Sequence, residues 1–236
     1  GKTEECDLQV SRGHIPNQYP IHKSGAVPAM SQNQTGTIWD ISDTVYPWSV
    51  WNTAGIVTAL AVNASDNGKH IVLSGLNEAF EEQTEELTLS SAAAVSSTKS
   101  FIRLNRAYIT NGSAANVADV TIQKSATNVL RIKAGLAQTL MAIDTIPADK
   151  TGYITPGTCP CQSGADATGG MYVRYSGDNS FRVGHSFEVS GTGGQYDYNF
   201  GMPLPLPEKS DIDVRATVRS NNARITAAFD ILLIDN

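Results

Sequence analysis

The chain's three cysteines are the first residues whose type and spacing suggest chemistry, and that chemistry would be metal binding. Cys159 and Cys161 flank Pro160, and a Cys/Cys pair completed by histidine can hold zinc. Zinc sites need further ligands at known spacings, and the chain offers no second cysteine pair. The short loop between the two cysteines would strain a disulfide. We therefore predict three reduced thiols, counting Cys6, as in a reducing cytosol, and no metal or other cofactor.

Acidic side chains form the second group with a chemical use. Five glutamates fall within residues 77–86, and calcium takes about six to eight oxygen ligands. The regular spacing of acids that marks a calcium loop is missing, so the sequence favours a solvated acidic loop. Asp211 and Asp213 share one face of a predicted strand and suit a pair of catalytic carboxylates. Arg215 continues the same row, however, and favours ordinary surface charge.

Histidine and serine side chains are the remaining candidates for catalytic groups. His185 lies on the apolar side of a predicted strand, where a buried, hydrogen-bonded ring is the expected outcome. A serine nucleophile on a Gly-x-Ser-x-Gly elbow is missing from the sequence. Residues 191–194 are glycine-rich, but no helix and no Gly-Lys-Ser/Thr ending follows, so a turn between strands is favoured. We therefore predict that the protein is not an enzyme.

The elements that position these residues are predicted to be β-strands. Apolar and polar residues alternate over residues 211–219 and again over residues 225–233. A period of two places successive side chains on opposite faces of a sheet. Residues 220–222, Ser-Asn-Asn, tolerate the positive φ of a tight turn. We predict a C-terminal hairpin with one apolar face, covered by a second sheet, and one face in solvent.

Short strand signals also recur through the middle of the chain at the spacing typical of a sandwich or barrel. They fall at residues 56–62, 70–76, 87–89, 101–110, 117–123, 129–133, 138–146, 153–155 and 181–189. Residues 77–86 are predicted to be a loop leading into a strand, because Glu81 and Glu85 are like charges one helical turn apart. The fold class is therefore all-β, an antiparallel β-sandwich of jelly-roll-like form.

Three regions are predicted along this chain. Residues 1–50 form an extended N-terminal arm, because repeated prolines keep the backbone extended and little alternation accompanies them. Residues 51–155 form a β-sandwich domain. Residues 156–236 form a C-terminal β-sheet region that either stands by itself or completes the same sandwich. The glycine- and proline-rich residues 156–170 are interpreted as the linker between the last two regions.

Aromatic residues are concentrated in and just after the predicted arm. Trp39, Trp48 and Trp51 carry too much apolar area to be left in water. They are buried against the chain's own β core or against another subunit, where tryptophan is enriched. Together with Tyr46 they are our candidate partner-binding residues.

Composition limits the classes of partner. The chain has 236 residues, of which 41% are apolar and 17% charged, with a net charge of -6. The acidic balance argues against a general nucleic-acid binder, which carries a basic face. No apolar run approaches the roughly 18 residues of a transmembrane helix, so no membrane partner is expected. The first residues lead into no apolar segment of a secretory signal.

Four stretches, taken in order, resemble a known family. They are Val10-Ser11-Arg12-Gly13-His14-Ile15-Pro16 with Thr37-Ile38-Trp39-Asp40 and Tyr46-Pro47-Trp48; Gly75-Leu76-Asn77 to Leu89 with Phe101-Ile102-Arg103-Leu104-Asn105-Arg106-Ala107; Gly135 to Pro147; and Pro207-Glu208-Lys209-Ser210-Asp211-Ile212 to Asn236. They span most of the chain, and the family is that of virion structural proteins from tailed bacteriophages, especially marine and cyanobacterial phages. The Cys-Pro-Cys motif and the acidic loop depart from its pattern.

The resemblance implies a structural protein of the virion, assembled in the host bacterial cytoplasm. We expect a decoration or cement protein that binds the capsid exterior, with the major capsid protein or other virion subunits as partners. A homo-oligomer is expected, with a trimer favoured. A tail or neck component is the alternative within this class. A carbohydrate-binding β-sandwich module is a further alternative, with Tyr172, Tyr196 and Tyr198 as its aromatic platform.

Overall fold

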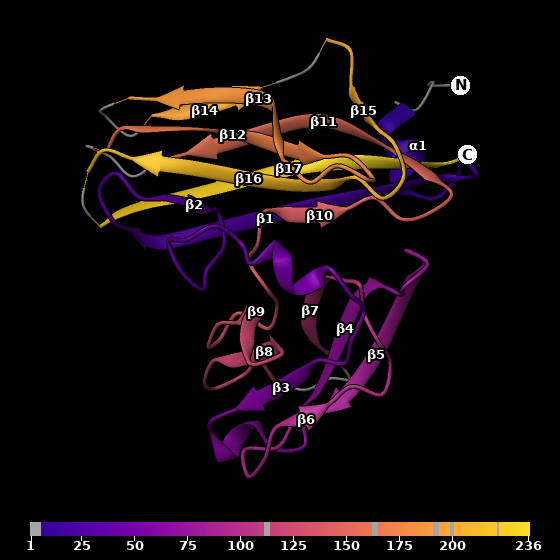
Figure 1. Ribbon diagram of the computed structural model, residues 1–236, viewed down its shortest axis with the longest axis vertical. Helices are drawn as coiled ribbons and strands as arrows, with labels where there is room; N and C mark the ends of the chain where they lie inside the picture. The colour runs from indigo at the N-terminus through magenta and orange to yellow at the C-terminus, as the bar shows by residue number, and fades with distance from the viewer. Residues whose placement is uncertain (1–5, 111–113, 162–164, 191–193, 199–200, 221) are drawn as a thin grey trace.

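The computed structural model describes residues 6–110, 114–161, 165–190, 194–198, 201–220 and 222–236 (Figure 1). Strands account for 55% of the structure and helices for 6%. Every pair of neighbouring strands in the described chain is antiparallel. The predicted all-β, antiparallel fold class is therefore confirmed. The predicted turns at residues 191–193 and at Asn221 lie outside the described residues.

Within the described residues, ten strands from both ends of the chain form two five-stranded sheets, which we call the terminal unit (Figure 1). The first sheet has the order β1 (Gln18–Met30), β17 (Ala223–Asp235), β11 (Lys150–Pro160) and β14 (Gln195–Tyr198), with β15 (Leu204–Leu206) also paired to β11. The second has the order β10 (Ile143–Thr145), β16 (Asp211–Val218), β12 (Ala167–Arg174) and β13 (Arg182–Val189), with β2 (Thr35–Thr37) paired to β16.

Seven further strands of the described chain form a smaller middle unit, which lies below the terminal unit in Figure 1. One sheet has the order β6 (Val95–Ser96), β3 (Thr58–Ala61), β8 (Val120–Lys124) and β9 (Thr127–Ile132). The other has the order β5 (Glu82–Thr88), β4 (His70–Leu76) and β7 (Arg103–Thr110). The helical elements are short: α1 (Cys6–Ser11), η1 (Trp48–Trp51) and η2 (Ala64–Asp66). Among the described helices, none is long and apolar enough to cross a bilayer.

The middle unit is inserted between β2 and β10, so the chain crosses between the units twice. The two crossings run side by side, because Trp39 forms a bridge with Met141 and the amide of Ala142 donates to the carbonyl of Ile38, 2.9 Å away. Gly25 of β1 packs against this crossing, and a Cβ there would collide with the Ile38 carbonyl and with Ala142. The two units therefore meet along a close backbone contact.

The apolar faces of the C-terminal strands point into the core as predicted, but the pairing of the strands is different. Phe229 in β17 and Val214 in β16 point into one apolar cluster between the two sheets of the terminal unit. The predicted hairpin is wrong, because β16 pairs with β2, β10 and β12, whereas β17 pairs with β1 and β11. Each strand thus supplies its apolar face to a different sheet, and the two faces cover one another.

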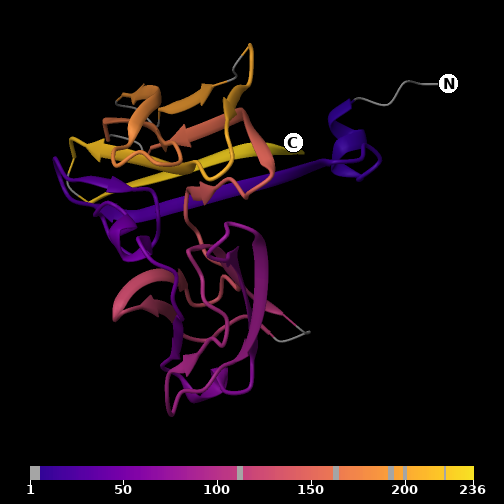
Figure 2. The same ribbon diagram turned by 45° about the vertical axis from the view of Figure 1, so that its right-hand side comes forward.

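The predicted arm is also different in the structure. Its residues 18–30 form β1, which pairs with β17 from Gln18–Ile234 to Val27–Ile225 and runs the length of the terminal unit (Figures 1 and 2). Proline is tolerated on such an edge strand, because the outer backbone groups need no ladder partner. The predicted linker is likewise replaced by strand, since β11 continues to Pro160 and β12 begins at Ala167.

Candidate functional site

The four aromatic residues predicted to bind a partner are buried inside the chain. Trp39, Tyr46, Trp48 and Trp51 are 2%, 2%, 6% and 1% exposed. Tyr46 stands edge-on to Trp39 and Trp48, with ring centroids 5.1 and 4.9 Å apart, and its hydroxyl accepts from Trp51 Nε1 at 2.8 Å. The segment that carries these rings crosses between the units, so they fill the junction. The prediction that they form a partner-binding surface is therefore wrong, and burial in the chain's own core is correct.

Asp213 in β16 ties this aromatic cluster to the terminal unit. Its carboxylate accepts from Thr37 Oγ1 at 2.7 Å, from Trp48 Nε1 at 2.8 Å and from Arg215 Nε at 2.8 Å. The side chain is fully buried. Burial raises the pKa of Asp213, and the Arg215 charge and these hydrogen bonds oppose that rise. Three donors on two oxygens use most of this carboxylate's accepting capacity.

Asp211, two residues earlier on the same face, joins the two units directly. Arg103 in β7 of the middle unit donates from Nε and Nη2 to its two oxygens, at 2.7 and 3.0 Å. Arg174 in β12 donates from Nε and Nη2 at 3.0 and 2.5 Å, and Thr145 Oγ1 donates at 2.7 Å. Bidentate Arg–carboxylate pairs of this kind fix geometry as well as charge. The predicted solvent face of β16 is therefore a buried junction, since Asp211 is only 2% exposed.

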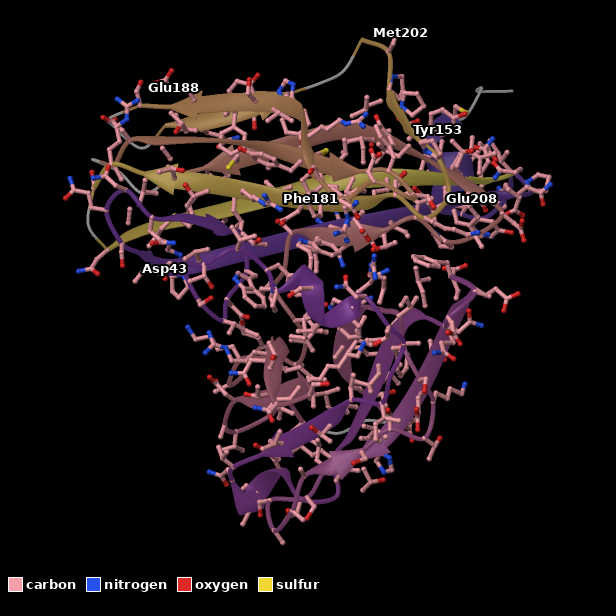
Figure 3. All side chains as sticks on the ribbon, viewed as in Figure 1. Asp43, Tyr153, Phe181, Glu188, Met202 and Glu208 are labelled. Atoms are coloured by element: carbon pink, nitrogen blue, oxygen red, sulfur yellow. The ribbon has the colours of Figure 1, made fainter. Side chains whose placement is uncertain are left out.

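The guanidinium groups at the junction also stack on aromatic rings. Arg103 and Arg174 lie 5.7 and 5.4 Å from the Trp48 ring centre. Arg174 and Arg215 lie 4.7 and 4.6 Å from that of Phe181, which Figure 3 labels on the face of the terminal unit. Such cation–π contacts are strengthened where water is excluded. The junction is therefore a continuous assembly of acid, guanidinium and ring.

A cleft of about 620 Å³ opens beside this junction, between the two units. Its walls come from β1, β4, β5, β7 and β10 together with residues 138–141. Lys23 and Asp144 line it from the terminal unit, and Asn105 and Arg106 line it from the middle unit. Lys23 and Asp144 are nearly fully buried, at 7% and 3% exposure. Burial lowers the pKa of Lys23 and raises that of Asp144.

Of the junction residues, Asp211, Asp213 and Trp48 were considered from the sequence, although in other roles, whereas Arg103, Arg174 and the cleft residues Lys23 and Asp144 were not. A signal was present, because Arg103 and Asp144 stand within apolar stretches, Ile-Arg-Leu and Ala-Ile-Asp-Thr-Ile. A charge inside a buried run requires a partner. The sequence does not reveal which partner, since Arg103 and Asp211 are 108 residues apart.

The other predicted chemical groups do not gather into one site. The His185 ring lies beside Tyr196 and Tyr198, and its Nε2 is 3.1 Å from the Tyr196 hydroxyl. Both tyrosines pack against the core, while Tyr172 lies under the Arg215 guanidinium at 4.8 Å. The predicted aromatic platform is therefore not one exposed surface.

The thiols and the acidic loop do not form a common site either, within the described residues. Cys159 and Cys161 are buried and Cys6 is exposed, and the described chain contains all three as thiols outside any disulfide. Burial raises the pKa of the Cys159 thiol. Glu85 from the acidic run accepts from the amides of Thr98 and Lys99, at 2.7 and 2.9 Å. Over the described ranges no three potential metal ligands come together.

The fold and junction define an all-β protein of two units locked together by buried charges. No family model and no curated protein matches the chain.

Proposed function

We propose that the protein is a structural component of a tailed-bacteriophage particle, a decoration or cement protein that binds the capsid exterior and works by contact. The observation that carries the proposal is the buried Arg103–Asp211–Arg174 connection between the two units. A cement protein must resist the separation of neighbouring shell subunits, and two β units on a flexible tether would yield before the shell did. A buried, hydrogen-bonded junction transmits load between them.

The layer arrangement supports the same reading. Two five-stranded sheets enclose one apolar cluster in the terminal unit, and face-to-face sheets of this kind are the architecture of a sandwich. We propose the finer description, a jelly-roll-like β-sandwich, for this unit. The proposed partners are the major capsid protein or other virion subunits, with the protein as a homo-oligomer, a trimer being favoured. A tail or neck component would use the same rigid frame.

Particles assembled without the protein test the proposal. Purified wild-type protein is added back, its position is imaged, and the temperature at which the particles release DNA is measured. Binding to the head with a raised release temperature supports a cement protein, whereas density on the tail supports the alternative. Binding with no gain in release temperature would contradict the cement role. The variant Asp211→Asn, which weakens the junction, is expected to occupy the same position while protecting the shell less.

A further inference from the structure

The cleft between the units contains two buried charged groups whose hydrogen-bonding capacity is only partly used. Lys23 on β1 and Asp144 on β10 both line the cavity of about 620 Å³ and are 7% and 3% exposed. Cavities of this size at the boundary between two units are typical of sites for small ligands. The cavity is therefore the strongest candidate for a binding site in the described molecule.

The Lys23 ammonium has donors to spare. An ammonium carries three N–H donors. One donates to the main-chain oxygen of Asn105, 2.7 Å away, and the described residues provide no acceptor for the others. Donors taken from water without a new partner are unfavourable. The remaining donors are therefore available to an acceptor placed inside the cleft.

Asp144, in contrast to Lys23, has acceptor positions that are not used. Its Oδ1 accepts the amide of Thr145 at 2.8 Å, and within the part of the chain that is described no donor reaches Oδ2. A carboxylate has about four lone-pair positions. Oδ2 is therefore available to a donor placed inside the cleft.

Each buried charge has a like charge on the cleft wall. Arg106 also lines the cleft and donates to Gln138 Oε1 at 2.9 Å; burial lowers the pKa of Lys23, and the Arg106 charge adds to that effect. Glu82 also lines the cleft, with its carboxylate 3.9 Å from Lys150 Nζ; burial raises the pKa of Asp144, and the Glu82 charge adds to that effect. The cavity lining thus contains two cationic and two anionic side chains, and the attraction between Lys23 and Asp144 opposes the effect of burial on both pKa values.

We propose that this cleft binds a small zwitterion, a free amino acid or a short peptide. Its carboxylate would face Lys23 and Arg106, and its ammonium would face Asp144 and Glu82. Lys23 and Asp144 already attract one another; a zwitterion would give each of them a hydrogen-bonded counter-ion of its own, whereas a ligand with a single charge would do so for only one of the two. The inference does not depend on the proposed role in a phage particle.

Strand addition is disfavoured at this place, which makes a zwitterion a better fit than a chain that only extends a sheet. Pro20 has no amide to offer on the edge of β1. On β10 the amide of Thr145 is already held by the Asp144 side chain. Recognition in the cleft therefore falls to charged side chains, which select charged ends.

Calorimetric titration of the full-length protein tests this with four probes. Glycine and triglycine carry both charges, N-acetyl-triglycine lacks the ammonium, and triglycinamide lacks the carboxylate. At least one zwitterion is expected to bind, and each blocked form of triglycine to bind at least about tenfold more weakly than triglycine if the peptide is the ligand. Preferential binding of glycine would identify a free amino acid as the ligand. Equal binding of blocked and unblocked peptides, or no heat with any probe, would overturn the proposal.

Variants locate the binding. Lys23→Met and Asp144→Asn remove the buried charges, whereas Arg106→Gln and Glu82→Gln change exposed side chains and preserve the fold. Each is expected to weaken zwitterion binding by about tenfold or more. Lys133→Gln, at an exposed lysine outside the cleft lining, is the matched control and should bind as wild type does. If the two buried variants do not fold, wild-type affinity in both Arg106→Gln and Glu82→Gln is sufficient to reject the site.

Discussion

Arg103 and Asp211 lie 108 residues apart in the sequence and form a bidentate ion pair in which neither residue is more than 8% exposed. Arg103 comes from the middle unit and Asp211 from the terminal unit, so this pair joins them at one point. Removing one partner of a buried pair leaves a desolvated charge without compensation. The contact is therefore more costly to break than an ion pair on the surface.

Asp211→Asn is expected to lower the free energy of unfolding by about 3–5 kcal/mol, because the buried Arg103 and the partly buried Arg174 would lose their counter-ion. Chemical denaturation followed by circular dichroism measures the change. Asp197→Asn, an exposed carboxylate on β14, is the matched control and should change little. Equal loss in the two variants would show that Asp211 behaves as a surface residue.

Asp40 gives the protein a dependence of stability on pH. Its Oδ2 is buried, the described residues place no hydrogen-bond donor beside it, and Arg131 Nε lies 3.8 Å from its Oδ1. Burial raises the pKa of Asp40 to about 6, Arg131 and Lys133 oppose the rise, and Asp119 adds to it. Because the folded pKa exceeds the unfolded value, the stabilising contribution is complete below the unfolded pKa and is lost as the pH rises through about 6.

Asp40→Asn should therefore raise the free energy of unfolding above pH 6 by on the order of 1–3 kcal/mol. It should do little at low pH, where Asp40 is already protonated. Melting temperatures of wild type and variant, compared across this range, measure the difference. Parallel curves at all pH values would show that Asp40 is ionised in the folded protein with an ordinary pKa.

Local alternation made several strands predictable. The prediction for residues 70–76 coincides with β4, and residues 77–86 form a loop that enters β5 at Glu82, as expected. Alternation also placed Asp211 and Asp213 on the face opposite Val214. It could not show what covers that face, because the covering groups, Trp48 and Arg103, are distant in sequence.

The C-terminal strands offer a second test of what the sequence predicted. Phe229→Ala should lower the free energy of unfolding by about 3–5 kcal/mol, because this ring is 1% exposed in the core of the terminal unit. Asp230→Ala, one residue further, alters the opposite face and should change stability much less. Denaturant midpoints of the two variants measure this. Similar losses would mean that β17 has its faces reversed.

The strand at the start of the chain was not predictable from local pattern. Two prolines, Pro20 and Pro28, interrupt the alternation in β1, and its partner β17 is distant in the chain, since the paired residues His22 and Asp230 are 208 residues apart. Edge strands tolerate proline and irregular faces because one side of the backbone makes no ladder. An edge strand with prolines and an interrupted alternation therefore has the same sequence pattern as an unstructured arm.

Deletion of the N-terminal segment tests whether β1 belongs to the core. A chain beginning at Gln18 keeps β1, whereas a chain beginning at Ser31 loses it, together with the buried side chains of Val27 and Met30. The second deletion exposes the inner edge of β17 and opens the apolar cluster between the sheets. An uncovered strand edge beside an open core is a site of aggregation.

The chain beginning at Ser31 is therefore expected to lose the cooperative melting of the terminal unit and to aggregate, while the chain beginning at Gln18 melts nearly as the full chain does. Circular dichroism melting and light scattering of both chains measure this. If β1 were an arm that only lies on the surface, the two chains would have similar melting temperatures. Similar melting without aggregation would thus show that the first sheet is stable with β17 as its edge.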